Sequence, residues 1–234
     1  MLQAQKHRLS TIRWTTLPHR LRVLKAFHTA RFALVPVNFI YPTAGEFFRI
    51  PLVRNLIDSV PNGSLFTQDN LRAILPNDLA PFIRWWYDDI ELKLINLLCG
   101  EFSNRVNTTT RADIFNLATS IFFCSICSRF LRYPHVLAHA CATLPFHQDD
   151  DLDASILTST LGETFWNLNG CITRNVRSVL LLAHLLLRAN FRPPTTIQEL
   201  NARNPIFECI SCNDERMGRA TMTWERVVRP PFFC

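Results

Sequence analysis

Apolar residues recur every three or four positions over much of this chain, which is the spacing of a helix with one buried face. The strongest such pattern begins behind Asp78, with Pro81 in the predicted first turn, and stops at Gly100. Aspartate accepts hydrogen bonds from the first N–H groups of a helix, and glycine readily adopts the conformation that ends one. The apolar stripe of this helix comprises Phe82, Trp86, Ile90, Leu94, Leu97 and Leu98.

The same spacing, bounded by proline and glycine, predicts several shorter helices. Thr110 with Asp113, and Thr196 with Glu199, have the spacing of a capping box, in which each side chain bonds the backbone N–H of the other residue. The other predicted helices cover residues 18–33, 51–57, 67–75 and 173–190.

Two short aliphatic and aromatic stretches interrupt the helical pattern, and each leads into a Cys-x-x-Cys (CxxC) sequence. Such stretches favour β-strands because branched and aromatic side chains pack well on a pleated surface. The predicted fold class is therefore mostly α with small α+β zinc-finger-like units, a helical body in which short strands lead into CxxC knuckles. The two units are residues 121–123 leading into Cys124 and Cys127, and residues 206–207 leading into Cys209 and Cys212.

Composition adds a division along the chain. Of 234 residues, 48% are apolar and 19% charged, which is enough apolar material for a core. Residues 1–45 hold seven of the 25 Lys and Arg and no acid, which leaves 18 basic and 19 acidic residues in the remainder. We predict a basic N-terminal arm at 1–45 and a single mostly helical domain at 46–234, with zinc-finger-like units at 121–141 and 206–234.

A basic arm without acids is typical of a mitochondrial transit peptide, and it can also contact nucleic acid or anionic lipid. A solvated helix is a third interpretation. The arm lacks the apolar stretch of a secretory signal, and the apolar run at 179–187 is shorter than the about 20 residues that span a membrane. We expect an intracellular protein of the cytoplasm or nucleus, or of the mitochondrion if the arm is a transit peptide, with no membrane association and with reduced cysteines.

Residues 124–141 contain the densest group of metal-ligand residue types in the chain. Structural zinc is held by four cysteine or histidine ligands in a tetrahedron. Eleven residues separate Cys127 from His139, close to the about twelve-residue gap of a two-Cys two-His zinc finger. A helix predicted to begin at Pro134 carries His139 in its last turn. The predicted ligands of a structural zinc ion are Cys124, Cys127, His139 and Cys141, with His135 as the alternative to Cys141.

Other interpretations of the cysteines stay open at this stage. Buried cysteines are common core residues, and a CxxC pair can be a redox site, although no βαβ pattern of a thioredoxin-like unit surrounds this one. The second CxxC pair lacks the expected histidine, because Arg226 and Arg229 stand on the turn that would carry it. The weak second site that remains consists of Cys209, Cys212 and Cys234.

Longer phrases around both CxxC pairs resemble a known family. They run from Leu117 to Cys141 and from Pro193 to Val228. Both are similar to the C-terminal half of uncharacterised F-box-like proteins from mushroom-forming fungi (basidiomycetes), over about residues 45–228. This chain departs from the family in that no F-box is evident near the N-terminus and the second unit lacks its histidine. The resemblance implies no activity, and implies metal ligands at Cys124, Cys127, His139, Cys141, Cys209 and Cys212.

These features favour a non-enzymatic, zinc-stabilised protein-interaction protein with an unidentified protein partner, related to F-box substrate-recognition proteins. Nucleic-acid binding through the arm is an alternative, but the body lacks a dense basic helix face, so we expect no nucleic-acid reader. A zinc enzyme is least favoured. The chain has no HExxH, P-loop, GxGxxG or GxSxG sequence, and the acids near the cysteines, Glu101 and Asp149–Asp153, have no recognised spacing.

Overall fold

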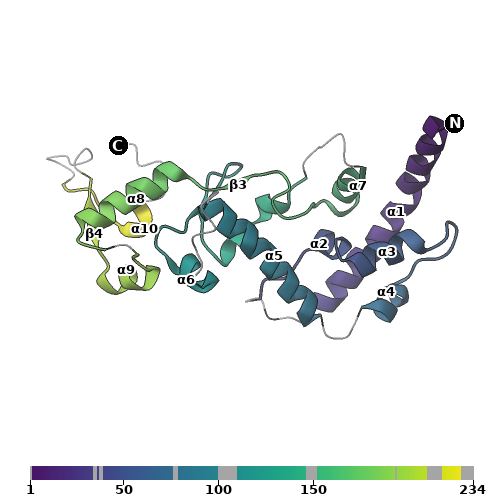
Figure 1. Ribbon diagram of the computed structural model, residues 1–234, viewed down its shortest axis with the longest axis horizontal. Coiled ribbons are helices and arrows are strands. Elements are labelled where there is room, and N and C mark those ends of the chain that lie inside the picture. The colour runs from purple at the N-terminus through teal and green to yellow at the C-terminus, as the bar shows by residue number, and fades with distance from the viewer. Residues whose placement is uncertain are drawn as a thin grey trace. The chain divides into compact units, whose positions relative to one another are not determined.

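The computed structural model describes residues 2–33, 36, 39–75, 79–99, 110–145, 152–192, 194–209 and 218–227. These residues form mainly helices, with two small antiparallel sheets (Figure 1). The prediction of a mostly α fold with small α+β units is therefore confirmed. None of the helices in these ranges is both long and apolar enough to cross a membrane.

The chain divides into two compact units. Unit 1 contains Met1–Ile90 and Leu137–Gly170, and unit 2 contains Glu91–Val136 and Cys171–Cys234. This division differs from the predicted basic arm at 1–45 followed by one domain at 46–234. The difference arises because apolar side chains from the first helix are buried against helices that lie much later in the sequence.

Unit 1 is helical in the residues that the structure describes. Leu21 and Leu24 of the first helix are fully buried in one cluster with Phe47, Ile156 and Leu157. The first helix packs against the last helix of the unit. This contact joins residues 137–170 to the N-terminal segment in one unit. The helices are α1 (Leu2–Phe32), α2 (Ala44–Phe48), α3 (Pro51–Ser59), α4 (Gln68–Ile74) and α7 (Leu152–Leu161), with the N-terminal part of α5 (Ala80–Cys99).

Two basic side chains of α1 bond the C-terminal ends of other helices. The last turn of a helix leaves carbonyl groups without partners, and that end carries partial negative charge. Arg20 is buried, and its guanidinium donates to the carbonyls of Ile57 and Val60 at the end of α3, the latter at 2.7 Å. Lys25 Nζ donates to the carbonyl of Leu161, the last residue of α7, at 2.7 Å. Part of the basic charge of the predicted arm therefore stabilises unit 1.

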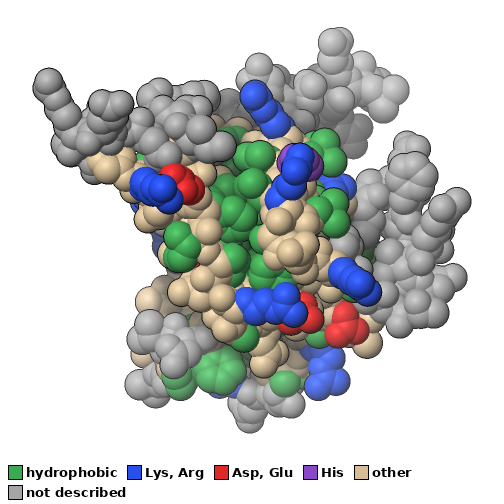
Figure 2. All heavy atoms as spheres, turned by 90° about the vertical axis from the view of Figure 1, so that its left-hand side faces the viewer, with side chains coloured by type: hydrophobic (Ala, Val, Ile, Leu, Met, Phe, Trp, Pro, Cys, Tyr) green, Lys and Arg blue, Asp and Glu red, His purple; other side chains and the backbone are tan. Residues whose placement is uncertain are grey.

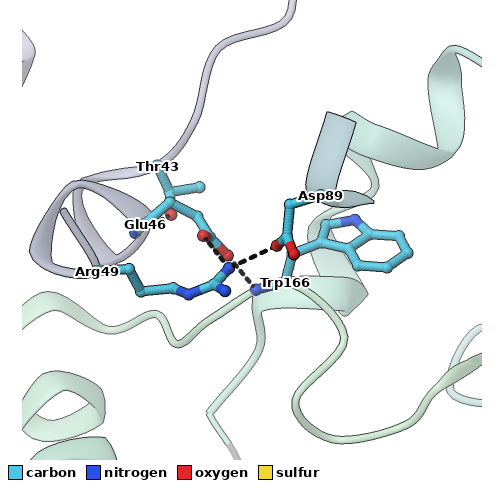
Figure 3. Close-up of polar contacts among 5 residues, drawn as sticks. All are labelled: Thr43, Glu46, Arg49, Asp89 and Trp166. Atoms are coloured by element: carbon cyan, nitrogen blue, oxygen red, sulfur yellow. Dashed lines mark hydrogen bonds and ion pairs between the residues drawn. The ribbon is translucent and has the colours of Figure 1, made fainter. Parts of the chain in front are cut away.

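Glu46 of α2 is a fully buried carboxylate, and each of its two oxygens has a polar partner (Figure 3). Its Oε2 lies 2.9 Å from Arg49 Nη1, and its Oε1 accepts a hydrogen bond from the backbone N–H of Trp166 at 2.7 Å. Arg49 Nη1 also lies 3.1 Å from Asp89 Oδ2, and Thr43 Oγ1 accepts from the Glu46 N–H at 3.3 Å. Burial opposes the charge of Arg49, but the Glu46 and Asp89 carboxylates outweigh it and raise the pKa of the guanidinium.

Unit 2 combines helices with both sheets. The first sheet has the strand order β2-β1-β3, and the second pairs β4 with β5. Leu182 and Leu186, Leu200 and Trp224 form its apolar cluster. The helices are α6 (Arg111–Asn116), α8 (Val176–Arg188), α9 (Ile197–Arg203) and α10 (Trp224–Val227); the strands are β1 (Phe122–Cys124), β2 (Phe130–Leu131), β3 (Ile172–Thr173), β4 (Ile206–Glu208) and β5 (Thr221–Thr223).

Arg132 connects the end of β2 with α10 inside unit 2. Its Nη2 donates to the carbonyl of Ala118 at 3.0 Å, and its guanidinium lies 4.9 Å from the ring centre of Trp224. Burial lowers the pKa of Arg132 to about 10, an effect that the charge of Glu225 partly offsets. The β1–β2 hairpin and the C-terminal helix therefore share one packed interior.

Candidate metal centre

The first CxxC sequence forms the turn between β1 and β2. Cys124 ends β1, stands opposite Ile172 of β3, and donates its backbone N–H to the carbonyl of Arg129 at 2.9 Å. Ser128 has φ of 56°, a left-handed conformation that turns the chain back toward β2. The sheet thus fixes Cys124 in a buried position, whereas Cys127 lies at the exposed tip of the turn.

The segment after β2 contains two short 3₁₀ helices, η2 (His135–Ala138) and η3 (Ala140–Thr143). The single helix predicted to begin at Pro134 and to carry His139 in its last turn is therefore wrong. His139 has extended backbone angles, φ −72° and ψ 117°, and precedes η3. Cys141 follows within η3. Both candidate ligands therefore lie at the start of η3, at the bend between the two 3₁₀ helices.

Hydrogen bonds from a later segment hold η3 in place. Asn169 Nδ2 donates to the carbonyl of Cys141 at 2.9 Å, and the backbone N–H of Asn167 donates to the carbonyl of Ala142 at 2.6 Å. The N–H of Ala142 in turn donates to the carbonyl of His139 at 2.9 Å. The role of Asn167 and Asn169 could not be predicted from the sequence. No metal-ligand residue type stands beside them, and α7 separates them from η3 along the chain.

The structure brings four candidate ligands together. One ligand atom from each of Cys124, Cys127, His139 and Cys141 lies within 4.8 Å of all the others. Sulfur atoms bound to tetrahedral zinc at about 2.3 Å stand about 3.8 Å apart, so shifts of an ångström or less would complete the geometry. Three thiolates and one imidazole suit zinc, whereas Mg²⁺ and Ca²⁺ require oxygen ligands.

The other predicted site residues lie elsewhere. His135 is in η2 and does not belong to the group that the described residues form. Cys209 is half-buried next to β4, and its N–H donates to the carbonyl of Ala220 at 2.9 Å. Cys212 and Cys234, the remainder of the weak second site, lie outside the described residues, as do Glu101 and the first acids of the run that begins at Asp149.

The cysteines whose side chains are described are thiols, not disulfides. They include Cys171, which is buried beside the knuckle, where its carbonyl accepts from the N–H of Ser125 at 2.9 Å. Free thiols are the form that a metal site needs, because the deprotonated thiol is the ligand.

Comparison with known proteins gives no relative. No protein-family model matches the chain, and neither a curated protein nor a solved structure matches it.

Proposed function

We propose that this protein is a non-enzymatic interaction protein in which a structural zinc ion stabilises the knuckle formed by β1, β2 and η3. The observation that carries the proposal is the convergence of Cys124, Cys127, His139 and Cys141, whose ligand atoms lie within 4.8 Å of one another. The four ligands are not gathered at one site in the unfolded chain. The free energy of zinc binding therefore contributes to folding.

The completeness of the ligand set supports a structural role. Catalytic zinc keeps an open position for water or substrate, usually with three protein ligands. Four cysteine and histidine ligands fill a tetrahedral ion and leave no such position. The resemblance to fungal F-box-like proteins supports a role in recognising another protein, and the reduced thiols that zinc requires agree with the intracellular setting expected from the sequence.

The contacts of α1 weigh against nucleic-acid binding as the alternative function. Arg20 and Lys25 bond the carbonyls of α3 and α7, so two charges of the predicted basic arm are engaged within unit 1. Affinity for phosphates depends on basic groups that can reach them, and Arg20 is buried, whereas Lys25 stays exposed while it bonds α7.

Metal analysis of the purified protein tests the proposal. We expect about one zinc per chain by mass spectrometry, and almost none in the Cys124→Ser, Cys127→Ser variant. Removing zinc from the parent with a chelator should lower the melting temperature by about 10 °C. Cys209→Ser is the matched control, because Cys209 is a half-buried cysteine outside the group, and it should retain the zinc.

Two results would contradict the proposal. The first is a double variant that keeps its zinc. The second is a parent protein, prepared with zinc and reductant, that binds no metal and instead forms a reversible disulfide between Cys124 and Cys127, as a redox pair would.

A further inference from the structure

Helix α8 of unit 2 exposes a stripe of aliphatic side chains. Val176 is 56% exposed, Leu180 is 64% exposed and Leu187 is 56% exposed, with half-buried Ala183 between them. These positions are separated by alternating intervals of four and three residues, which is the spacing of the seam between two helices of a coiled coil. The stripe therefore has the geometry of one half of a helix–helix contact.

The stripe is not needed for the core of unit 2. The inward side of α8 already buries Val179, Leu182 and Leu186. Exposed aliphatic side chains in a continuous row favour aggregation unless a partner covers them, and such rows mark interaction surfaces. The stripe extends over the length of α8, whereas scattered single exposed leucines would need no explanation.

The surroundings of the stripe are positively charged. Residues 171–198 contain four arginines and no acid. Arg177 and Arg188 are exposed on α8, together with His184, and Arg192 is exposed shortly after the helix. Figure 2, which faces the side of the molecule where α8 lies, shows hydrophobic side chains with Lys and Arg side chains around them and a few Asp and Glu side chains on the same face. A partner that covers this surface must supply both aliphatic side chains and negative charge.

We propose that the α8 stripe, formed by Val176, Leu180 and Leu187, docks an amphipathic helix of another protein, with an aliphatic seam flanked by Asp or Glu. The inference rests on the proposed function as an interaction protein and specifies the chemistry of the partner. Acidic flanks of the partner would pair with Arg177, which directly follows Val176 and stands beside the seam, and would lie on the same side of α8 as Arg188.

The charges and the side chains of α8 disfavour two other occupants. A second copy of this chain would bring only further basic side chains to the stripe, because α8 has no acid to offer. Helices that lie in a membrane surface bury a broad apolar face and often carry Trp or Phe. α8 has no Trp, Phe or Tyr to insert into a membrane surface.

Peptide binding tests the proposal. The probe is a fluorescein-labelled helical peptide of about three heptads, with leucine at the seam and glutamate at the flanking positions. We expect the parent to bind it at least about tenfold more tightly than the same peptide with lysine flanks, by fluorescence anisotropy. The Leu180→Ser, Leu187→Ser variant should lose at least about tenfold in affinity for the glutamate peptide.

Matched variants separate this surface from general effects. Leu52 lies on α3 and is 60% exposed, so Leu52→Ser removes an equally exposed leucine and should leave binding unchanged. The Arg177→Glu, Arg188→Glu variant should reverse the preference toward the lysine peptide. Because all substituted side chains are exposed, each variant should keep the circular dichroism spectrum of the parent.

Several outcomes would overturn the proposal. These are equal binding of both peptides, binding that Leu180→Ser, Leu187→Ser does not weaken, a parent dimer that this variant dissociates, and stripe-dependent sedimentation with phosphatidylserine vesicles. Zinc content measured on the same preparations separates this test from the proposed function. Failure to bind the peptide by zinc-loaded protein contradicts only the docking surface, whereas protein without zinc contradicts the proposed function whatever the peptide does.

Discussion

Glu46 and Asp69 each pair with an arginine three residues later in the chain. The pairs are nearly equal in length, 2.9 Å for Glu46 with Arg49 and 2.7 Å for Asp69 with Arg72. Their exposure differs, since the side chain of Glu46 is 1% exposed and that of Asp69 is 82% exposed. Water screens the exposed pair, whereas a buried charge that loses its partner has nothing else to solvate it.

We therefore expect Glu46→Ala to lower the free energy of unfolding of unit 1 by about 1–3 kcal/mol. The buried N–H of Trp166 loses its acceptor in this variant, and the half-buried guanidinium of Arg49 keeps only Asp89 as a partner. Asp69→Ala should unfold at the same denaturant concentration as the parent. Urea denaturation followed by tryptophan fluorescence measures both, and equal midpoints for the two variants would show that Glu46 is solvated.

Residues of the metal centre were predictable from sequence to a degree that Glu46 was not. The four candidate ligands lie between Cys124 and Cys141, and the spacing of their residue types indicates the metal directly. Glu46 stands in a short segment without any pattern that signals a buried acid. Its partner Trp166 comes from a part of the chain that only the tertiary structure brings near.

Local side-chain chemistry determined where several helices begin. The capping boxes of Thr110 with Asp113 and of Thr196 with Glu199 are confirmed, with reciprocal hydrogen bonds between side chains and backbone N–H groups. Hydrogen bonds from Thr196 lower the pKa of Glu199. The helix predicted from Pro134 instead forms two 3₁₀ segments, because so short a helix has little stability of its own and follows its tertiary contacts.

The end of α3 provides a prediction at this scale. We expect Arg20→Ala to lower the free energy of unfolding of unit 1 by about 1–3 kcal/mol, because the carbonyls of Ile57 and Val60 lose a charged donor. Arg22 lies two residues later on the same helix but is exposed, so Arg22→Ala is the matched control and should melt with the parent. Thermal unfolding followed by circular dichroism makes the comparison, and equal losses would exclude a role for the Arg20 contacts.

Each unit has an apolar cluster of its own within the described residues. Leu24 is fully buried in the cluster of unit 1, and Leu182 is fully buried in that of unit 2. The sequence alone predicted one domain at 46–234, because periodicity identifies the buried side of a helix but not the distant helix that covers it. The packing of α1 against α7 depends on contacts between the two ends of unit 1 in the sequence.

Hydrogen exchange can show whether the two clusters are separately stable. Leu24→Ala and Leu182→Ala should each cost about 2–5 kcal/mol. We expect Leu24→Ala to accelerate amide exchange mainly in α1, α2 and α7, and Leu182→Ala mainly in α8 and α9, because the lost contacts are confined to one cluster. If either substitution accelerated exchange equally throughout the described residues, the molecule would unfold as a single cooperative block.

Because unit 1 is made of two segments that are distant in sequence, it cannot fold completely until late in translation. Leu21 and Leu24 emerge early, but Leu157, which shares their cluster, is translated more than a hundred codons later. At typical elongation rates the apolar face of α1 stays exposed on the nascent chain for on the order of ten seconds. Chaperones that recognise such surfaces would have their longest opportunity here, and a message interrupted before α7 would yield a chain that cannot bury its first helix.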